Sequence, residues 1–149
     1  MNEESATDKA VMAATGAALL AAAGRSMNVW SVVFGIAAIL LNLLPPTLMA
    51  STLLLAASML VALAQAIFAV RCAFDAALFA SFGGNDAHYQ CFDQLLFTWG
   101  LNPSPTVTRS LQERVAGARR LLRSQLLCLL AQMALFAVGA GIKMAGTVQ

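Results

Sequence analysis

The sequence predicts an all-α integral membrane protein with three transmembrane helices. Hydrophobic residues make up 60% of the 149 residues and charged residues only 11%, whereas a soluble domain typically has roughly 45–50% and 25%. The mean hydropathy of +0.76 agrees with this class. Seven acidic and nine basic side chains are too few to cover a water-soluble core. A bilayer removes that requirement, and three long apolar runs are available to cross it.

The first 24 residues are expected to form an acidic N-terminus followed by an Ala-rich run. The acidic start, MNEESATDK, argues against a secretory signal, which requires a basic start. The run from Ala10 to Gly24 has about 15 residues, fewer than the roughly 20 that a spanning helix needs. We therefore expect residues 1–24 either to lie at the membrane interface or to extend the first membrane helix.

Residues 25–70 are predicted to form a transmembrane hairpin with spans at 27–44 and 47–70. The Pro45-Pro46 pair separates the spans, because proline lacks an N–H and the residue before it avoids the α region. The second run is stopped only by Arg71, and its roughly 24 residues can cross the bilayer with some tilt. The turn between the two spans carries no charge.

A third span is predicted at 125–142, followed by a C-terminal tail at 143–149. Basic residues near spans stay cytoplasmic, and most of the bases lie in residues 71–124. We therefore expect the N-terminus and 71–124 in the cytoplasm and the C-terminus outside. Of the nine bases, only Lys143 disagrees with this topology. Frequent Ala, Leu and Arg suggest a GC-rich bacterial genome, hence a bacterial inner (cytoplasmic) membrane.

Residues 71–124 are predicted to be helical rather than a loop. Apolar residues keep a helical spacing up to Gly83-Gly84, a pair typical of a helix C-terminus. A short amphipathic helix is expected from Asp86 to Trp99. Its apolar face would carry Phe92, Leu95, Leu96 and Trp99.

Helicity is expected to resume either at Ser104, as an N-cap before Pro105, or at Ser110 in a capping box with Glu113. From there it would run unbroken into the third span. The second and third membrane helices would then each be ~55 Å long, well beyond the ~30 Å hydrocarbon core. We expect both to extend into the cytosol as a helical hairpin, with the short helix folded against its tip.

Small and polar side chains mark a packing face on each predicted span. In lipid, helices associate through close backbone approach and interhelical hydrogen bonds, and an interval of seven residues returns to nearly the same face. The helix-packing residues, span by span, are Ser31, Gly35 and Asn42; Ser51, Ser58 and Gln65; and Gln125, Gln132 and Gly139. A polar pathway is the alternative, but no span carries the central ionisable residue that such pathways usually contain. We therefore expect these side chains to bond to one another.

The pattern FDxxLF occurs twice, at 74–79 and at 92–97. Each copy places Phe and Leu on one helical face beside an acidic residue. The two copies could therefore form two equivalent docking edges for a partner helix. The alternative, which we favour, is a chance repeat with both faces buried against the arginine-bearing helix. The acids would then pair with arginines of that helix, Asp75 and Asp93 with Arg109 or Arg114.

A basic cluster opposed only by Glu113 precedes the third span. Its members are Arg109, Arg114, Arg119, Arg120 and Arg123. Such clusters attract anionic lipid headgroups by about 1 kcal/mol per residue. A phosphate or nucleic-acid site would require a Gly-rich cradle or interleaved exposed aromatics, so we expect no nucleic acid. The predicted partner or lipid surface consists of these arginines with Phe74, Asp75, Phe79, Phe92, Asp93 and Phe97.

No catalytic, cofactor-binding or metal-binding residues are predicted. Cys72, Cys91 and Cys128 form no CxxC pair, which favours reduced thiols over a disulfide framework. His88 and Cys91 form a single HxxC pair, whereas zinc requires four ligands. His88 also has no obvious nucleophile beside it. We expect no enzyme, no cofactor and no small-molecule substrate.

Three hypotheses for function remain. The first is a small non-enzymatic accessory or scaffold subunit of a bacterial inner-membrane assembly, with other membrane-protein subunits as partners. The alternative is a homo-oligomeric pore or small transport protein, holin-like in size, in which the polar stripes face water. A membrane immunity or regulatory protein is a second alternative, and the sequence does not separate it from the first.

Overall fold

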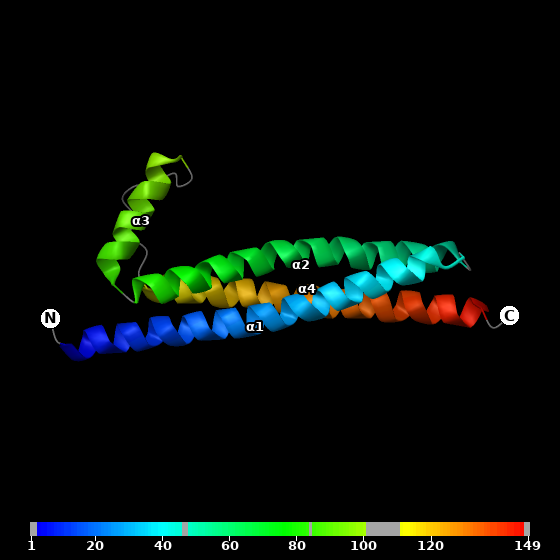
Figure 1. The fold of residues 1–149 in the computed structure, drawn as a ribbon, viewed down its shortest axis with the longest axis horizontal. Helices are drawn as coiled ribbons and strands as arrows, with labels where there is room; N and C mark the ends of the chain where they lie inside the picture. The colour runs from blue at the N-terminus through cyan, green and yellow to red at the C-terminus, as the bar shows by residue number, and fades with distance from the viewer. Residues whose placement is uncertain (1–2, 46–47, 84, 101–110, 148–149) are drawn as a thin grey trace.

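The part of the chain that the structure describes folds into four α-helices and contains no strand. The structure is a computed structural model, and it describes residues 3–45, 48–83, 85–100 and 111–147. The helices are α1 (Glu3–Leu43), α2 (Met49–Phe82), α3 (Asp86–Thr98) and α4 (Leu111–Thr147). Helices α1, α2 and α4 lie side by side as a long bundle, and α3 projects from one end of it (Figure 1).

The predicted all-α class with three membrane-spanning helices is confirmed at this level. Three helical stretches are long and apolar enough to cross a bilayer: Thr7–Leu43, Met49–Phe82 and Gln112–Gly146. Helix α1 has 41 residues, because the Ala-rich run continues into the first apolar run without a break. At 1.5 Å per residue, all three long helices measure ~50–60 Å.

The ends of the helices follow the local sequence. Helix α1 ends just before Pro45. Helix α2 ends before Gly83, whose φ is 55° and whose N–H donates to the Phe79 carbonyl at 3.2 Å, as glycine commonly does at a helix C-terminus. Helix α3 begins after Asn85, whose side chain accepts a hydrogen bond of 3.0 Å from the Ala87 N–H. The predicted start signals at Ser104 and Ser110 lie outside the described residues.

Two contacts show which residues of the three long helices lie at the same height. The Gln125 Nε2 donates to the Gly24 carbonyl at 3.0 Å. A Cβ placed on Gly24 would lie 3.4 Å from the Cys72 Cβ. Gly24, Cys72 and Gln125 therefore form one level, to which α1, α2 and α4 contribute one residue each.

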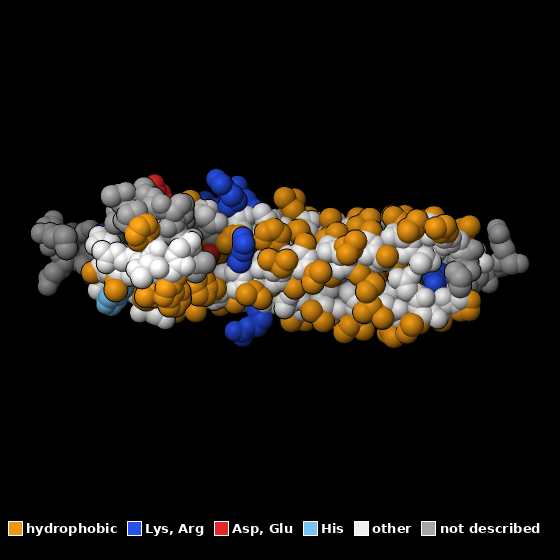
Figure 2. All heavy atoms as spheres, turned by 90° about the horizontal axis from the view of Figure 1, so that it is seen from above, with side chains coloured by type: hydrophobic (Ala, Val, Ile, Leu, Met, Phe, Trp, Pro, Cys, Tyr) orange, Lys and Arg blue, Asp and Glu red, His pale blue; other side chains and the backbone are white. Residues whose placement is uncertain are grey.

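Arginines from all three long helices surround this level. Arg25, Arg71 and Arg123 are each within two residues of it in sequence, or within ~3 Å along the helix axis. All three are exposed, as are Arg119 and Arg120 about one turn away on α4. We call these five residues the arginine belt. Figure 2 shows Lys and Arg side chains gathered in a band, with hydrophobic side chains covering the long surface on one side of it.

The belt divides the bundle into two parts. The spanning section runs from the belt to Leu43 at the end of α1, Met49 at the start of α2 and Lys143 in the last turns of α4. It is about 18–22 residues, or ~27–33 Å, long, which equals the ~30 Å thickness of a hydrocarbon core. The head comprises the rest: the N-terminal part of α1, the C-terminal part of α2, all of α3 and the start of α4.

The interiors of the two parts differ in chemistry. Buried side chains of the head are apolar, and all of those in the described residues except Ala13 form one cluster with its edge at the belt: Ala17, Leu20, Cys72, Ala76, Phe79, Tyr89 and Ala118. Most buried side chains of the spanning section are polar: Ser31, Ser51, Ser58, Gln65, Gln125, Gln132 and Lys143. Water drives apolar groups into a core, whereas lipid provides no such force and leaves packing and hydrogen bonds to join helices. The interior of the bundle therefore changes from apolar to largely polar at the level of the belt.

Lys143, the one base that disagrees with the predicted topology, has a structural role. Its side chain is only 2% exposed, and its Nζ donates to the Leu44 carbonyl at 3.0 Å. The last carbonyls of a helix lack intrahelical partners, and a cation beside them is favourable. Lys143 therefore joins the end of α4 to the end of α1, and its position does not require a cytoplasmic location.

Replacing Lys143 by methionine is expected to lower the free energy of unfolding by about 1.5–3 kcal/mol, the usual contribution of a charge-assisted hydrogen bond. Methionine keeps most of the apolar stem and removes the ammonium. Denaturation of the purified chain in mixed micelles measures the change. Arg120→Met, an exposed substitution on the same helix, should change stability by less than ~0.5 kcal/mol. Equal stability of both variants would show that the Lys143 bond contributes nothing.

Candidate functional site

A junction of three helices lies within the spanning section, around Gln132 of α4. The Ser31 Oγ donates to the Gln132 Oε1 at 2.6 Å, and the Gln132 Nε2 donates to the Ser31 carbonyl at 2.8 Å. The Ser58 Oγ of α2 donates to the Gln132 carbonyl at 3.3 Å. All three residues are buried. One glutamine thus connects α1, α2 and α4 by hydrogen bonds that no water in a bilayer core would replace.

The other predicted packing residues on α2 and α4 also point into the bundle. Gly139 allows α4 to approach α2 closely, since a Cβ there would lie 3.1 Å from the Leu55 Cγ. The Ser51 Oγ donates to the Leu48 carbonyl within its own helix, at 2.7 Å. Gln65 is fully buried, and neither polar atom of its amide has a hydrogen bond in the described residues.

Two predicted residues of α1 lie less deeply in the bundle. Gly35 and Asn42 are half-buried. A Cβ on Gly35 would lie 3.8 Å from the Ala62 Cβ, an ordinary contact. The Asn42 Oδ1 is buried without a hydrogen bond among the described residues. The hydrogen bonds between α1 and α4 are therefore made at Gly24, at Ser31 and, just past the end of α1, at Leu44.

The side chain of Arg114 on α4 binds α3 to the rest of the head. Its Nη2 forms an ion pair with the Asp93 carboxylate, and its Cζ lies 4.9 Å from the centre of the Tyr89 ring. The Tyr89 ring also meets Phe82 edge-on, at 5.1 Å between ring centres, and Phe79 at 6.3 Å. Buried Tyr89 thus anchors α3 in the apolar cluster, and Arg114 holds both the ring and the neighbouring acid.

The two FDxxLF copies contact each other at one end. The rings of Phe74 and Phe92, the first residues of the copies, have centres 6.2 Å apart. Phe79 is buried, but Phe74 and Phe97 remain exposed, so the expectation that both apolar faces are buried is wrong for those two residues. Asp93 pairs with Arg114, one of the arginines expected for it, and Arg109 lies outside the described residues.

Helix α3 does not fold flat against the tip of the bundle. It points away from the long axis (Figure 1), because its apolar contacts come mainly from its first half. Its second half leaves large apolar side chains exposed: Leu95 at 44%, Phe97 at 43% and Trp99 at 66%. A shallow groove of about 630 Å³ continues from this surface to the end of α2, between Phe82, Cys91 and Leu95.

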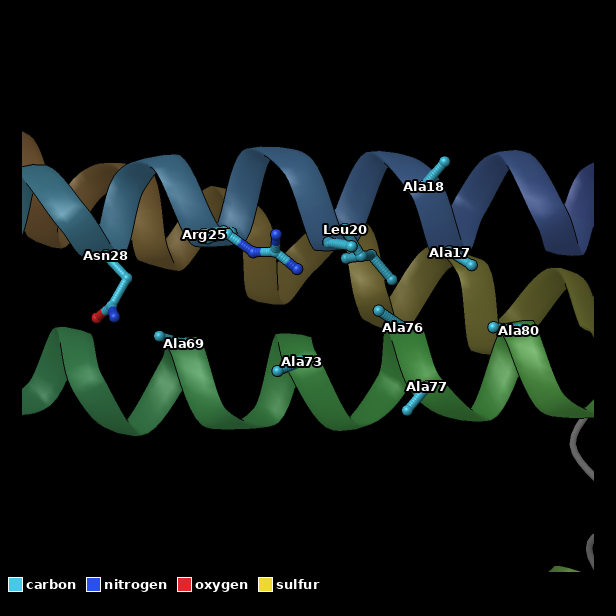
Figure 3. A pocket seen from close by; sticks show the side chains of 12 residues that line it. Ala17, Ala18, Leu20, Arg25, Asn28, Ala69, Ala73, Ala76, Ala77 and Ala80 are labelled. Carbon is cyan, nitrogen blue, oxygen red and sulfur yellow. The ribbon is translucent and has the colours of Figure 1, made fainter.

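A second groove, of about 520 Å³, lies between α1 and α2 and crosses the level of the belt. Alanines of both helices line most of it, as Figure 3 shows. The side chains of Arg25 and Asn28 point from α1 into the space between the helices. The alanines of both helices recur at intervals of three and four residues, and this spacing was a detectable signal for the groove in the sequence.

A third cavity, of about 290 Å³, lies between α2, α3 and α4 inside the head. Its wall combines the aromatic rings of Phe79 and Tyr89 with the charged groups of Asp75, Glu113 and Arg114. Asp75 is half-buried, and this burial raises the pKa of its carboxyl above the usual value, although the positive charges of Arg114 and Arg71 act in the opposite direction. Asp75 forms no hydrogen bond or ion pair in the described part of the chain.

The three thiols have different surroundings. Cys72 is buried, Cys91 is exposed on α3 and Cys128 is half-buried in the spanning section. His88 stacks on Phe82, with ring centres 5.8 Å apart. Within residues 3–45, 48–83, 85–100 and 111–147, no three His, Cys, Asp or Glu side chains are grouped so as to hold a metal ion.

Comparison with known proteins adds no functional information. No protein-family model, no curated protein and no solved structure shows a significant match to this chain. The physical features described above are therefore the only basis for a functional proposal.

Proposed function

We propose that the chain is a small non-enzymatic accessory or scaffold subunit of a bacterial inner-membrane assembly, and that its head docks a partner protein. The observation that carries this proposal is the position of α3. Arg114 holds the first half of this helix, while Leu95, Phe97 and Trp99 remain exposed on the second half. Aromatic side chains of this kind dominate the binding energy of protein interfaces.

The partner surface faces the cytoplasm in this proposal. The belt places its arginines at one end of an apolar section of membrane thickness, and basic residues prefer the cytoplasmic side. Because Lys143 is engaged with the end of α1, it no longer argues against this orientation. The N-terminus and the head then lie in the cytoplasm, and the C-terminus lies in the periplasm or outside the cell. The arginine belt contacts anionic headgroups.

The burial of the polar side chains of the spanning section favours a scaffold function rather than a pore. Ser51, Ser58, Gln65, Gln125 and Gln132 are all fully buried inside one copy of the chain. Lining a water-filled pore would require the three helices to separate and give up the bonds around Gln132. A membrane immunity or regulatory protein would use the same α3 surface and differ only in the identity of its partner.

A photoreactive amino acid at position 99 tests the proposal in native membranes. We expect one foreign protein to be crosslinked at Trp99, which is 66% exposed on α3, and not at Val11, a matched control that is 59% exposed on α1. Mass spectrometry of the crosslinked product identifies the partner. Capture of only further copies of the chain would favour the oligomeric pore, with liposome leakage as the deciding measurement. Capture of nothing, or equal capture at both positions, would contradict the docking surface.

A further inference from the structure

The Asp75 carboxylate of the head forms no hydrogen bond or ion pair with the other described residues. Arg114, the cation that lines the same cavity, is already paired with Asp93 and covers the Tyr89 ring. Arg71 acts on Asp75 through its charge but forms no ion pair with it. A partly buried carboxylate is stabilised by a cation that donates hydrogen bonds to it. Asp75 therefore has the capacity to bind one more such group.

The cavity around Asp75 suits a small ammonium group. Its 290 Å³ volume is at the lower end of the range for ligand sites. The aromatic residues Phe79 and Tyr89 also line the cavity, and the Tyr89 ring already contacts one cation, the Arg114 guanidinium. Arg114, the cationic side chain among the lining residues, is already paired with Asp93, so a ligand would meet the negative charge of Asp75. An anion would meet a repulsive site, whereas an ammonium with N–H groups finds an acceptor.

The position of Asp75 relative to the belt suggests where this ammonium comes from. Asp75 follows Arg71 by four residues on α2, so both project from the same side of the helix, ~6 Å apart along its axis. Arg71 belongs to the belt at the edge of the spanning section, and Asp75 lies one turn further from the lipid. In a zwitterionic phospholipid the negative phosphate lies nearer the hydrocarbon and the positive ammonium lies further out. Arg71 and Asp75 therefore place a complementary charge beside each of the two groups.

We propose that Arg71 and Asp75 bind the headgroup of a phospholipid that carries a primary ammonium. The phosphate contacts the Arg71 guanidinium, and the ammonium enters the cavity and donates hydrogen bonds to the Asp75 carboxylate. A quaternary ammonium lacks the N–H groups for that bond, and an anionic headgroup without an amine faces repulsion from Asp75. This inference rests on the membrane position of the belt in the function proposed above, and it adds a selective lipid site to a surface otherwise expected to attract anionic lipids in general.

Native mass spectrometry of the full chain in detergent tests the site. The probes are phosphatidylethanolamine, phosphatidylcholine and phosphatidylglycerol with identical acyl chains. We expect the unmodified chain to retain phosphatidylethanolamine about fivefold more than phosphatidylcholine, whereas phosphatidylglycerol reports the general attraction of the arginine belt for anionic lipids. Asp75→Asn should lower this retention to the level of phosphatidylcholine, and Arg71→Gln should weaken it without changing the fold, because Arg71 is exposed. Asp8→Asn, at an exposed acid of α1, is the matched control and should bind as the unmodified chain does.

Competition with soluble phosphoethanolamine distinguishes a membrane lipid from a free ligand. A lipid site is expected to keep its phosphatidylethanolamine when millimolar phosphoethanolamine is added. Displacement by phosphoethanolamine would overturn the assignment to a lipid. Equal retention of phosphatidylethanolamine and phosphatidylcholine by the unmodified chain, or unchanged retention of phosphatidylethanolamine by Asp75→Asn, would overturn the site itself. Each of these results leaves the α3 docking surface untouched, since crosslinking at Trp99 measures that surface independently.

Discussion

Replacing Arg114 by alanine is expected to release α3 from the head and to lower the free energy of its docking by about 2–4 kcal/mol. The substitution removes a charge-assisted ion pair worth about 1.5–3 kcal/mol and a cation–π contact worth about 0.5–2 kcal/mol. It also leaves the largely buried Asp93 carboxylate without its cation. Hydrogen exchange should show the loss as faster exchange of the backbone amides of α3, with the three long helices unchanged.

Arg119→Ala is the matched control, because Arg119 lies on the same helix but is exposed. It should leave exchange in α3 unchanged. The double variant of Arg114→Ala with Asp93→Asn should lose less than the sum of the two single variants, since each removes part of the same interaction. Slow exchange of α3 in Arg114→Ala would show that the apolar contacts of Tyr89 are sufficient to hold this helix.

Replacing Gln132 by leucine is expected to destabilise the association of α1 with the other two spanning helices by about 1–3 kcal/mol. Leucine is close to glutamine in size but cannot replace either side-chain bond to Ser31. Interhelical hydrogen bonds in membranes contribute about 0.6–2 kcal/mol each. Steric trapping or denaturation in lipid bicelles measures the free energy of unfolding, and the midpoint should fall by the corresponding amount.

A double-variant cycle separates the bond from the change in packing. In the background of Ser31→Ala, the side-chain oxygen of Gln132 has already lost the hydroxyl donor. Gln132→Leu should therefore cost less there than in the unmodified chain. Ala131→Leu, at an exposed neighbouring position of α4, controls for the added apolar surface. Strict additivity of the two substitutions would exclude a coupled Ser31–Gln132 bond.

The spanning part of the fold could be predicted from the sequence because the physics of lipid leaves a regular pattern. An apolar run of sufficient length predicts each span, and polar residues at intervals of seven predict one face of a helix. Ser58 and Gln132 were singled out in this way, and the structure brings both to the junction with Ser31. The pattern contains no information about which residue of one helix meets which residue of another, so the particular bonds required the structure.

The head could be predicted less well, because single side chains determine it. The direction of α3 depends on Tyr89, whose position three residues before Phe92 was a detectable signal for an apolar face. The role of Lys143 depends on the end of a helix roughly a hundred residues earlier, and the sequence alone gives only its charge. The cavity beside Asp75 arises where three helices diverge. No periodic pattern in the sequence of a single helix predicts such a cavity.

The central claim is that the arginine belt marks the cytoplasmic boundary of the membrane, and the native thiols test it most directly. Cys91 is exposed in the head, whereas Cys128 lies in the spanning section. A membrane-impermeant maleimide is expected to label Cys91 in inside-out vesicles, to leave it unlabelled in right-side-out vesicles, and to leave Cys128 unlabelled in both. Labelling of Cys91 only in right-side-out vesicles would reverse the orientation. Protection of Cys91 in both preparations, or labelling of Cys128, would contradict the boundary itself.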